Sequence, residues 1–373
     1  AFPRVGVEVA NVTMIGGAAK SRSWAQMIAD ATETTVYLQA VSEAACRGAA
    51  ILAGLGVGII KDLKAAAATL ERRKGVAFFA DVCDSFGYNP YEFSRQVYRR
   101  LYPEQAVEAL HFGYPFREAD LEANNAYLAE LIQEHSIAGL YMPRPDAQRE
   151  ELERAVGERG FLGFKPYPDL VYGKTRPEIR IGDYISPAVW EVADEGGLIV
   201  LVHPNRPGRL YDYLDIKDFS AASARYPQAK IIAHIGRPYI LSMIVAGIPE
   251  EYKRAHNIWF DICPICESEV LARAIEDLGP KWLLFGTDSP FTYMRGRLGE
   301  YKEERKFFTN ADYVWNVERE LPEKEAGYTF YQYEQLRAPK RAAAKVGLSS
   351  SDVEDIMYGN AKQLVGSARH GKP

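Results

Sequence analysis

The sequence of 373 residues has few cysteines, no long apolar run and no marked excess of charge of one sign. Four cysteines are too few for a disulfide framework, so we expect reduced thiols and a cytoplasmic protein. No uninterrupted apolar run reaches the ~18 residues of a membrane span, and we expect no secretory leader. With 45 Lys and Arg against 50 Asp and Glu, the chain lacks the excess positive charge that is typical of proteins that bind nucleic acid or anionic membranes. The missing initial Met suggests processing or a longer protein.

What is present is the composition of a globular protein, with 47% hydrophobic and 25% charged residues. The chain is rich in Ala and Gly before residue 70, and the charged, Ala-rich segment Lys61 to Lys74 indicates a solvated helix at a boundary. The polar tail favours disorder. We therefore predict a small N-terminal α/β appendage over 1–72, a larger domain over 76–366 and a disordered tail over 367–373.

Short apolar runs recur in the larger domain, separated by segments with helical spacing and charged faces. These eight runs span 76–81, 106–112, 137–141, 161–165, 198–203, 230–234, 258–262 and 282–288. Runs without polar alternation are typical of parallel strands buried on both faces. Eight strand–helix units of this length predict a (β/α)8 TIM barrel, whose chemistry lies at the C-terminal ends of the strands.

Three polar residues close the predicted strands, namely His203, His234 and Asp288. Two imidazoles and a carboxylate are the ligand set of a catalytic divalent metal with an open position for water. The metal would lower the pKa of that water, and Asp288 would accept its proton. The alternative is that each residue is a satisfied polar group in a crowded barrel mouth.

The motifs around these residues resemble the amidohydrolase superfamily, in its amidohydrolase-related branch of hydrolases and decarboxylases. The resemblance covers residues 76–366 and rests on VLVHPN at 200–205, IIAHIGRP at 231–238, LLFGTDSP at 283–290 and GFLGFKPYP at 160–168. It implies a divalent metal, usually zinc, at the C-terminal face of the barrel. It further implies His203 as a ligand, His234 as a ligand or water-positioning group, and Asp288 as ligand and general base.

One departure from the family lies at the first strand, which normally ends in His-x-His. Here the segment is FADVCDSFG at 79–87, with Cys83 and Ser85 in place of the histidines. Three interpretations stay open. Cys83 replaces a ligand as a thiolate; a metal is held weakly by the remaining three groups; or the site works without metal, with Asp288 as base and Arg or Lys as electrophile.

Other residues near the strand ends are candidates for substrate binding. Lys165 ends the fourth strand and is predicted to pair with a substrate carboxylate or another charged group. Arg206 and Arg237 are predicted to bind a substrate carboxylate through their planar guanidinium groups. The alternative is that they form salt bridges that brace loops. Tyr114 lines an apolar pocket wall or packs in its loop. The aromatic and charged segment 291–335 is predicted to form a lid or an oligomer contact.

The pair Cys263 and Cys266 forms an isolated CxxC. A redox pair normally accompanies a thioredoxin-like βαβ pattern, which is missing, and a zinc half-site needs partners. Packing as small apolar residues is the favoured interpretation, and a cysteine-assisted metal site is the alternative.

Residues 1–72 resemble the extreme C-terminal part of an FGGY-family carbohydrate kinase, through MIGGAAKSRSWAQMIAD at 14–30 and EAACRGAAILAGLGVG at 43–58. The resemblance implies that Gly16, Gly17 and Ser21 belong to a loop that contacts the adenosine end of ATP. The phosphate-binding loops and the catalytic aspartate of those kinases have no counterpart here, which predicts no sugar phosphorylation by this segment.

These observations favour a barrel enzyme that hydrolyses or decarboxylates a small, carboxylated substrate. The alternatives are a degenerate barrel that serves as a binding or assembly module, and the C-terminal part of a bifunctional kinase–hydrolase chain. We expect a small-molecule substrate and no nucleic-acid or membrane partner.

Overall fold

The computed structural model describes residues 11–14, 35–39, 72–74 and 90–370, except 116, 118, 207, 235–246, 302–303, 312, 314–315 and 317–318. The chain divides into two compact units. The first contains residues 1–90 and 309–328, and the second contains 91–308 and 329–373. The division beside Pro90 lies C-terminal to the boundary predicted at residues 72–76.

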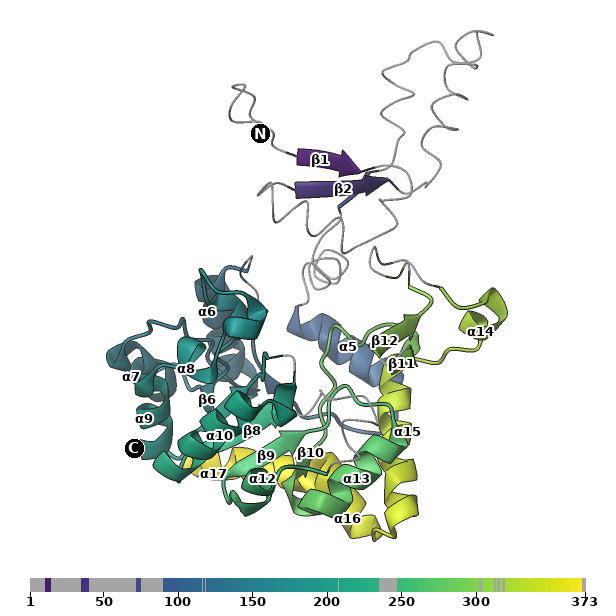
Figure 1. The fold of residues 1–373 in the computed structure, drawn as a ribbon. Coiled ribbons are helices and arrows are strands. Elements are labelled where there is room, and N and C mark those ends of the chain that lie inside the picture. The colour runs from purple at the N-terminus through teal and green to yellow at the C-terminus, as the bar shows by residue number, and fades with distance from the viewer. Residues whose placement is uncertain are drawn as a thin grey trace, which may run out of the picture. The chain divides into compact units, whose positions relative to one another are not determined.

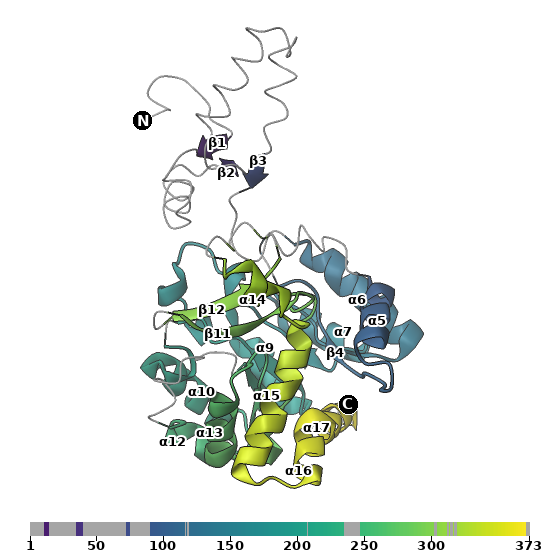
Figure 2. The same cartoon turned by 90° about the vertical axis from the view of Figure 1, so that its right-hand side faces the viewer.

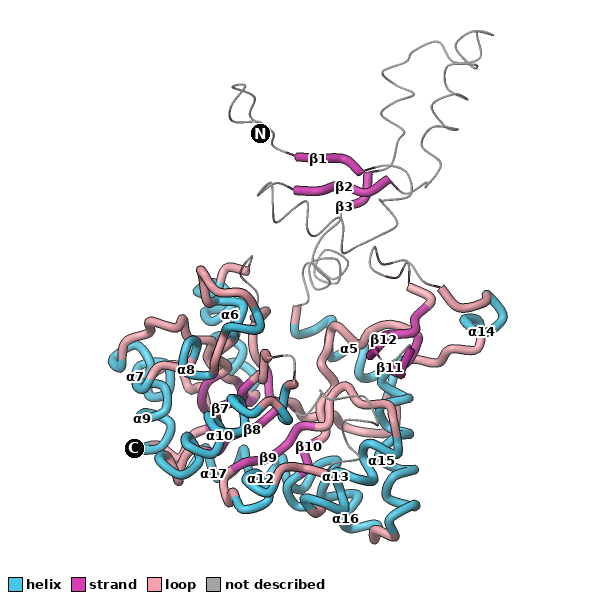
Figure 3. The backbone as a smooth tube through the Cα atoms, viewed as in Figure 1, coloured by secondary structure: helices cyan, strands magenta, loops and turns pink. Residues whose placement is uncertain are grey.

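In the first unit, the described N-terminal residues form a three-stranded sheet of order β1-β2-β3 (Figure 3). Strand β1 (Asn11–Met14) pairs parallel with β2 (Thr35–Gln39), and β3 (Arg72–Lys74) pairs antiparallel with β2. The prediction of a helix through Lys74 is therefore wrong for its last three residues, whose backbone pairs with Tyr37 to Gln39. The unit also contains α14 (Pro322–Ala326).

The second unit is built on parallel strands in chain order. They are β4 (Leu110–His111), β5 (Ala138–Gly139), β6 (Gly163–Phe164), β7 (Ile199–Val202), β8 (Lys230–His234), β9 (Ile258–Asp261) and β10 (Leu283–Leu284). Strands β6 to β10 form one parallel sheet, β4 pairs parallel with β5, and a parallel bridge from Tyr141 to Phe164 connects the two groups. Each strand falls within a predicted run, as the (β/α)8 barrel requires; the first predicted run, 76–81, lies outside the described residues.

Helices alternate with these strands and cover the sheet (Figures 1 and 2). They are α5 (Tyr91–Leu101), α6 (Leu121–His135), α7 (Arg149–Gly157), α8 (Ile181–Tyr184), α9 (Pro187–Glu195), α10 (Tyr213–Arg225), α12 (Glu250–Arg254), α13 (Ser268–Leu278), α15 (Tyr331–Val346), α16 (Ser350–Glu354) and α17 (Asn360–His370). Single turns are η3 (Pro168–Leu170), η4 (Arg176–Glu178), η5 (Arg209–Tyr211), η6 (Pro280–Trp282) and the π-helical η7 (Asp355–Gly359).

Local sequence explains where two of these helices begin and end. Helix α6 begins after Asp120, whose carboxylate accepts a hydrogen bond from the backbone N–H of Ala123, a typical N-cap. Helix α17 continues to His370 and so includes the first four residues of the predicted tail. It continues because Leu364 and Ala368 pack into the barrel core, which stabilises the last turns.

The predicted lid or oligomer segment, 291–335, contains strands β11 (Gly296–Tyr301) and β12 (Glu304–Thr309), which form a two-stranded sheet. Backbone pairing between Arg295 and Phe330 closes the base of this segment at the start of α15. Its role as a lid or contact stays a prediction.

A close approach of β6 to β7 sets the position of the functional residues that follow them. Gly163 has a φ of 146°, and a Cβ atom there would lie 1.9 Å from the carbonyl oxygen of Ile199. Only glycine allows this approach without displacing a strand. The barrel interior beside it is filled by apolar residues from successive strands, including Leu140, Leu162 and Ile232.

Candidate active site

Charged side chains meet at the C-terminal edge of the parallel sheet. Lys165 follows β6, His203 follows β7, His234 ends β8, Asp261 ends β9 and Asp288 lies in the loop after β10. Because β6 to β10 are neighbours in this order, their ends form one continuous rim. The predicted residues Lys165, His203, His234 and Asp288 thus lie on that rim, together with Asp261, which the sequence analysis did not single out.

Lys165 is the most deeply buried charged group of this rim, with 3% of its surface exposed. Its ammonium nitrogen lies 5.4 Å from the ring centre of Phe112 and 5.1 Å from that of Tyr167. Burial lowers the pKa of Lys165 to about 8, although the carboxylates of Asp261 and Asp288 act in the opposite direction. A buried ammonium beside two aromatic rings is suited to bind an anionic group that replaces its lost hydration.

The two histidines of the rim lie ring over ring. The ring centres of His203 and His234 are 5.2 Å apart, with 23° between the planes. The Nδ1 atom of His234 lies 2.9 Å from Oδ2 of Asp261, while Oδ1 of Asp261 accepts a hydrogen bond from the backbone N–H of Cys263. Asp261 is thereby fixed by the backbone and in turn orients His234, which is how a carboxylate commonly positions an imidazole in a working site.

The Asp288 side chain is exposed, in contrast to that of Lys165. Its backbone has a φ of 56°, a left-handed conformation that Asp and Asn adopt more readily than most residues. The preceding carbonyl, that of Thr287, accepts a hydrogen bond of 2.6 Å from the hydroxyl of Thr292. The loop therefore places the Asp288 carboxylate at the barrel rim, and the hydrogen bond from Thr292 fixes the backbone just before it.

Buried amides of α15 support this loop. Gln332 is fully buried, and its Nε2 donates to the hydroxyls of Ser289, at 2.8 Å, and Thr292, at 3.1 Å. Its Oε1 accepts from the hydroxyl of Tyr102 at 2.6 Å, and the hydroxyl of Tyr98 also donates to Ser289. Residues far apart in sequence thus form a clamp of hydrogen bonds on Ser289 and Thr292, in the loop that carries Asp288.

We expect Gln332→Leu to lower the free energy of unfolding by about 1–3 kcal/mol, because the half-buried hydroxyl of Tyr102 loses its acceptor and the hydroxyls of Ser289 and Thr292 lose a donor. It should also lower kcat more than it changes KM, since the Asp288 loop loses its support. Equilibrium denaturation and steady-state kinetics measure the two effects. Gln363→Leu, at an exposed position of α17, is the matched control and should change neither. An unchanged stability of Gln332→Leu would contradict the role of the clamp.

The described residues do not form the predicted metal centre. Among them, no three His, Cys, Asp or Glu side chains are arranged to hold a metal ion. The imidazoles of His203 and His234 are stacked rather than convergent, and the positive charge near Asp261 and Asp288 is that of Lys165. The fourth predicted ligand, Cys83, lies outside the described residues. The three described ligands by themselves do not form a metal-binding group, and the four-ligand site with Cys83 stays a prediction.

Arg206 forms an ion pair that braces a loop. Its Nε donates to Oδ1 of Asp212 at 2.8 Å, and its Nη1 donates to the carbonyl of Pro177. Tyr114 follows β4 at the same end of the barrel, and its backbone N–H donates to Asn124 at 3.5 Å. For Arg206, the loop-bracing alternative is therefore the one that the geometry shows.

Arg237 and the N-terminal Gly16, Gly17 and Ser21 lie outside the described residues, so their predicted roles stay predictions.

In the CxxC pair, Cys263 is buried and Cys266 is half-buried. Cys263 is 3% exposed, and burial raises the pKa of Cys266 to about 12, which keeps its thiol protonated. Both properties agree with the predicted packing role and disfavour a reactive thiolate.

Comparison with known families identifies the barrel. The sequence profile of the family described as Amidohydrolase matches residues 84–366, about three quarters of the chain. The chain belongs to the amidohydrolase family. The profile of the C-terminal domain of the FGGY family of carbohydrate kinases matches residues 2–57 of this amidohydrolase. Both resemblances stated from the motifs are thus confirmed.

Solved structures are also similar to this amidohydrolase over about three quarters of its chain. An amidohydrolase from Burkholderia multivorans has a TM-score of 0.47 and 14% identity, covering 76% of this chain and 91% of that one. A dihydroxybenzoic acid decarboxylase from Polaromonas, solved with manganese and 2-nitroresorcinol, has a TM-score of 0.44 and 20% identity, covering 76% and 92%. Similarity at this level does not identify a reaction.

The N-terminal segment is also similar to known proteins. Over 58 residues it is 41% identical to autoinducer-2 kinase of Salmonella paratyphi B, covering 16% of this chain and 11% of the kinase. The chain spans about a tenth of the length of the curated relatives it matches. Among the helices that the structure describes, none has both the length and the apolar character needed to cross a membrane.

Proposed function

We propose that this amidohydrolase hydrolyses an ester or amide bond in a small, carboxylate-bearing substrate, with Asp288 as general base. The observation that carries the proposal is the buried ammonium of Lys165 on the same rim as an exposed carboxylate and an oriented imidazole. Lys165 would bind the substrate carboxylate, because a charge-assisted hydrogen bond is strong where water is excluded. Its aromatic neighbours would exclude that water.

The proposed reaction uses three of the rim residues in turn. Asp288 accepts a proton from water, and the water oxygen bonds to the substrate carbonyl carbon. His234, oriented through Nδ1 by Asp261, donates from Nε2 as an imidazolium to the developing oxyanion. Collapse of the tetrahedral intermediate breaks the bond to the leaving group, which takes the proton from Asp288. Water and substrate are thereby converted to an acid and an alcohol or amine.

Decarboxylation is the second candidate, favoured by the apolar surroundings of Lys165. A carboxylate held against the rings of Phe112 and Tyr167 would lose hydration, which favours departure of CO2. The carbon left behind would take a proton from the protonated form of Asp288. Decarboxylation releases CO2 and consumes no water, whereas hydrolysis of an ester or amide consumes water and yields an acid with an alcohol or amine. The products therefore distinguish the two candidates.

The first test is a substrate panel of carboxylate-bearing esters, lactones and amides, each paired with its uncharged methyl ester. Hydrolysis of the carboxylate form in preference to its methyl ester supports the proposal. Release of CO2 from aromatic acids would instead support decarboxylation. Binding of such acids without turnover would favour the degenerate binding module. Mass spectrometry of the products separates these outcomes.

A metal is expected to contribute little to this activity, because the described donors do not converge. Of the three interpretations that the sequence leaves open, only the one with Cys83 as a ligand beside His203, His234 and Asp288 predicts a tightly held zinc ion. We favour the other two, in which a metal is held weakly or is not used. After dialysis, zinc should be substoichiometric by atomic emission, and chelation should change activity by less than about twofold. One tightly bound ion per chain would show that residues outside the described ranges complete a metal site.

The N-terminal segment offers a further candidate function. A loop of Gly16, Gly17 and Ser21 would contact a nucleotide if the kinase resemblance extends to binding. Such a role belongs to the alternative of a bifunctional kinase–hydrolase chain. ATP consumption with pentoses or polyols, which we do not expect, would support it.

A further inference from the structure

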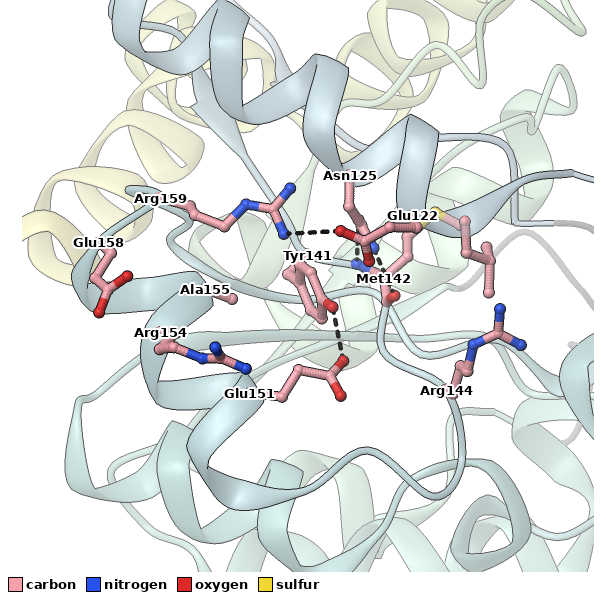
Figure 4. A pocket seen from close by; sticks show the side chains of 11 residues that line it. Glu122, Asn125, Tyr141, Met142, Arg144, Glu151, Arg154, Ala155, Glu158 and Arg159 are labelled. Atoms are coloured by element: carbon pink, nitrogen blue, oxygen red, sulfur yellow. Dashed lines mark hydrogen bonds and ion pairs between the residues drawn. The ribbon is translucent and has the colours of Figure 1, made fainter.

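A separate cavity of about 390 Å³ lies on the helix-covered side of the barrel (Figure 4). We call it the outer pocket. Its walls come from α6 and α7, and its floor includes Tyr141 and Met142, which follow β5. Leu140 belongs to the barrel core, whereas the Tyr141 hydroxyl donates to Glu151 of α7 at 2.7 Å. The outer pocket therefore opens on the opposite side of this strand from the barrel interior.

The arginines of the outer pocket are not equally engaged. Arg159 forms an ion pair with Glu122, with 3.7 Å between Nη1 and Oε1. Arg144 and Arg154 also line the pocket, and neither forms an ion pair with another residue in the described part of the chain. Figure 4 shows the arginine and glutamate side chains around the pocket, with Arg159 directed at Glu122. Two guanidinium groups are thus available to an anion.

A carboxylate at the same cavity limits which anion would fit. Glu151 is half-buried and accepts from Tyr141 through Oε1, so its position is fixed. A bound anion without a hydrogen-bond donor would face this carboxylate unfavourably. A hydroxyl group on the ligand would instead donate to Glu151, as the Tyr141 hydroxyl does.

We propose that the outer pocket binds a small hydroxylated phosphate or carboxylate. Arg154 would hold the anionic group, Glu151 would accept from the ligand hydroxyl, and Arg144, on the other side of the pocket in Figure 4, would add positive charge. The volume suits a ligand of metabolite size, and guanidinium groups match the planar or tetrahedral oxygens of such anions. This site is independent of the chemistry proposed for the barrel rim.

The outer pocket and the rim share one layer of packing. Met142, on the pocket floor, packs in a buried cluster with Leu121, Leu170 and Tyr167. Tyr167 is one of the two rings beside the Lys165 ammonium. A ligand in the outer pocket would therefore lie behind the wall that surrounds Lys165, without contacting it.

The test uses glycerol 3-phosphate, inorganic phosphate and glycerol as probes for the full chain in titration calorimetry. Glycerol 3-phosphate carries both groups, whereas phosphate has only the anion and glycerol only the hydroxyls. We expect glycerol 3-phosphate to bind more tightly than phosphate, and glycerol not to bind. Arg154→Gln should weaken the affinity for glycerol 3-phosphate at least about tenfold, as loss of one charge-assisted contact predicts. A hydroxy acid, glycerate, tests the carboxylate form of the same chemistry.

Two control variants distinguish this site from others. Arg149→Gln removes the same charge from α7, but Arg149 is engaged with Glu153 and Glu195, so affinity should stay near wild type. Lys165→Met should also leave affinity unchanged, which separates the outer pocket from the rim. Equal losses in Arg154→Gln and Arg149→Gln, or loss of binding in Lys165→Met, would overturn the proposal. So would undetectable binding of all three anions by the wild-type chain.

Discussion

Replacing Asp288 by Asn is expected to lower turnover at least about 100-fold while thermal unfolding stays near that of the wild type. The substitution removes the charge and basicity but keeps the size of the side chain. Asn adopts the left-handed conformation that Asp288 has at a φ of 56°, so the loop needs no rearrangement. The side chain is exposed, and the buried ammonium of Lys165 keeps the second carboxylate near it, that of Asp261, as a counter-charge. The expected loss is therefore chemical rather than structural.

Steady-state kinetics on the best substrate of the panel, together with a thermal melt, measures both parts of this prediction. Asp146→Asn, an exposed carboxylate in the turn before α7, is the matched control and should retain full activity. A fully active Asp288→Asn protein would remove both the hydrolytic and the decarboxylating mechanism. It would leave the binding module as the better description of this amidohydrolase barrel.

Replacing Lys165 by Met is expected to lower kcat/KM at least about tenfold for carboxylate-bearing substrates, with most of the effect in KM. Met fills a similar volume against Phe112 and Tyr167 but provides no charge for the substrate carboxylate. The methyl ester of the same substrate should lose much less, because it makes no ion pair. An equal loss for acid and ester would show that Lys165 does not recognise the carboxylate.

The pH dependence provides an independent test of Lys165. Burial lowers its pKa to about 8, so the ammonium that binds the substrate is present below this pH and is lost above it. We expect kcat/KM for the wild type to fall as pH rises through about 8. In Lys165→Arg this fall should disappear, because a guanidinium stays charged throughout that range. A fall that persists in Lys165→Arg would assign it to another group.

Much of the candidate active site could be predicted from the ends of apolar runs. Lys165, His203, His234 and Asp288 each follow or end such a run, and parallel strands bring their C-terminal ends to one edge. Asp261 carries the same signal, since it ends β9, and the pattern could have identified it. It was missed because its role as the partner of a histidine depends on the register of β8 against β9, which places His234 opposite Asp261.

The residues that support the site could not be found in this way. Gln332 and Tyr98 lie on helices about 230 residues apart and meet at Ser289 only because the chain folds back on itself. Nothing in the local pattern of α15 distinguishes Gln332 from an ordinary polar position. Its burial and its three partners are properties of the packed structure.

The sequence by itself determined the parallel α/β architecture, the family and most of the residues on the rim. Those properties follow from local hydrophobic periodicity and from motifs, both of which depend on residues close together in the sequence. The tertiary structure alone decided which charges face each other. It placed Lys165 beside Asp261 and Asp288, engaged Arg206 in a loop, stacked the two imidazoles and left Arg144 and Arg154 around a cavity. Electrostatic partners are set by distances of a few ångströms between residues far apart in sequence, and only packing fixes those distances.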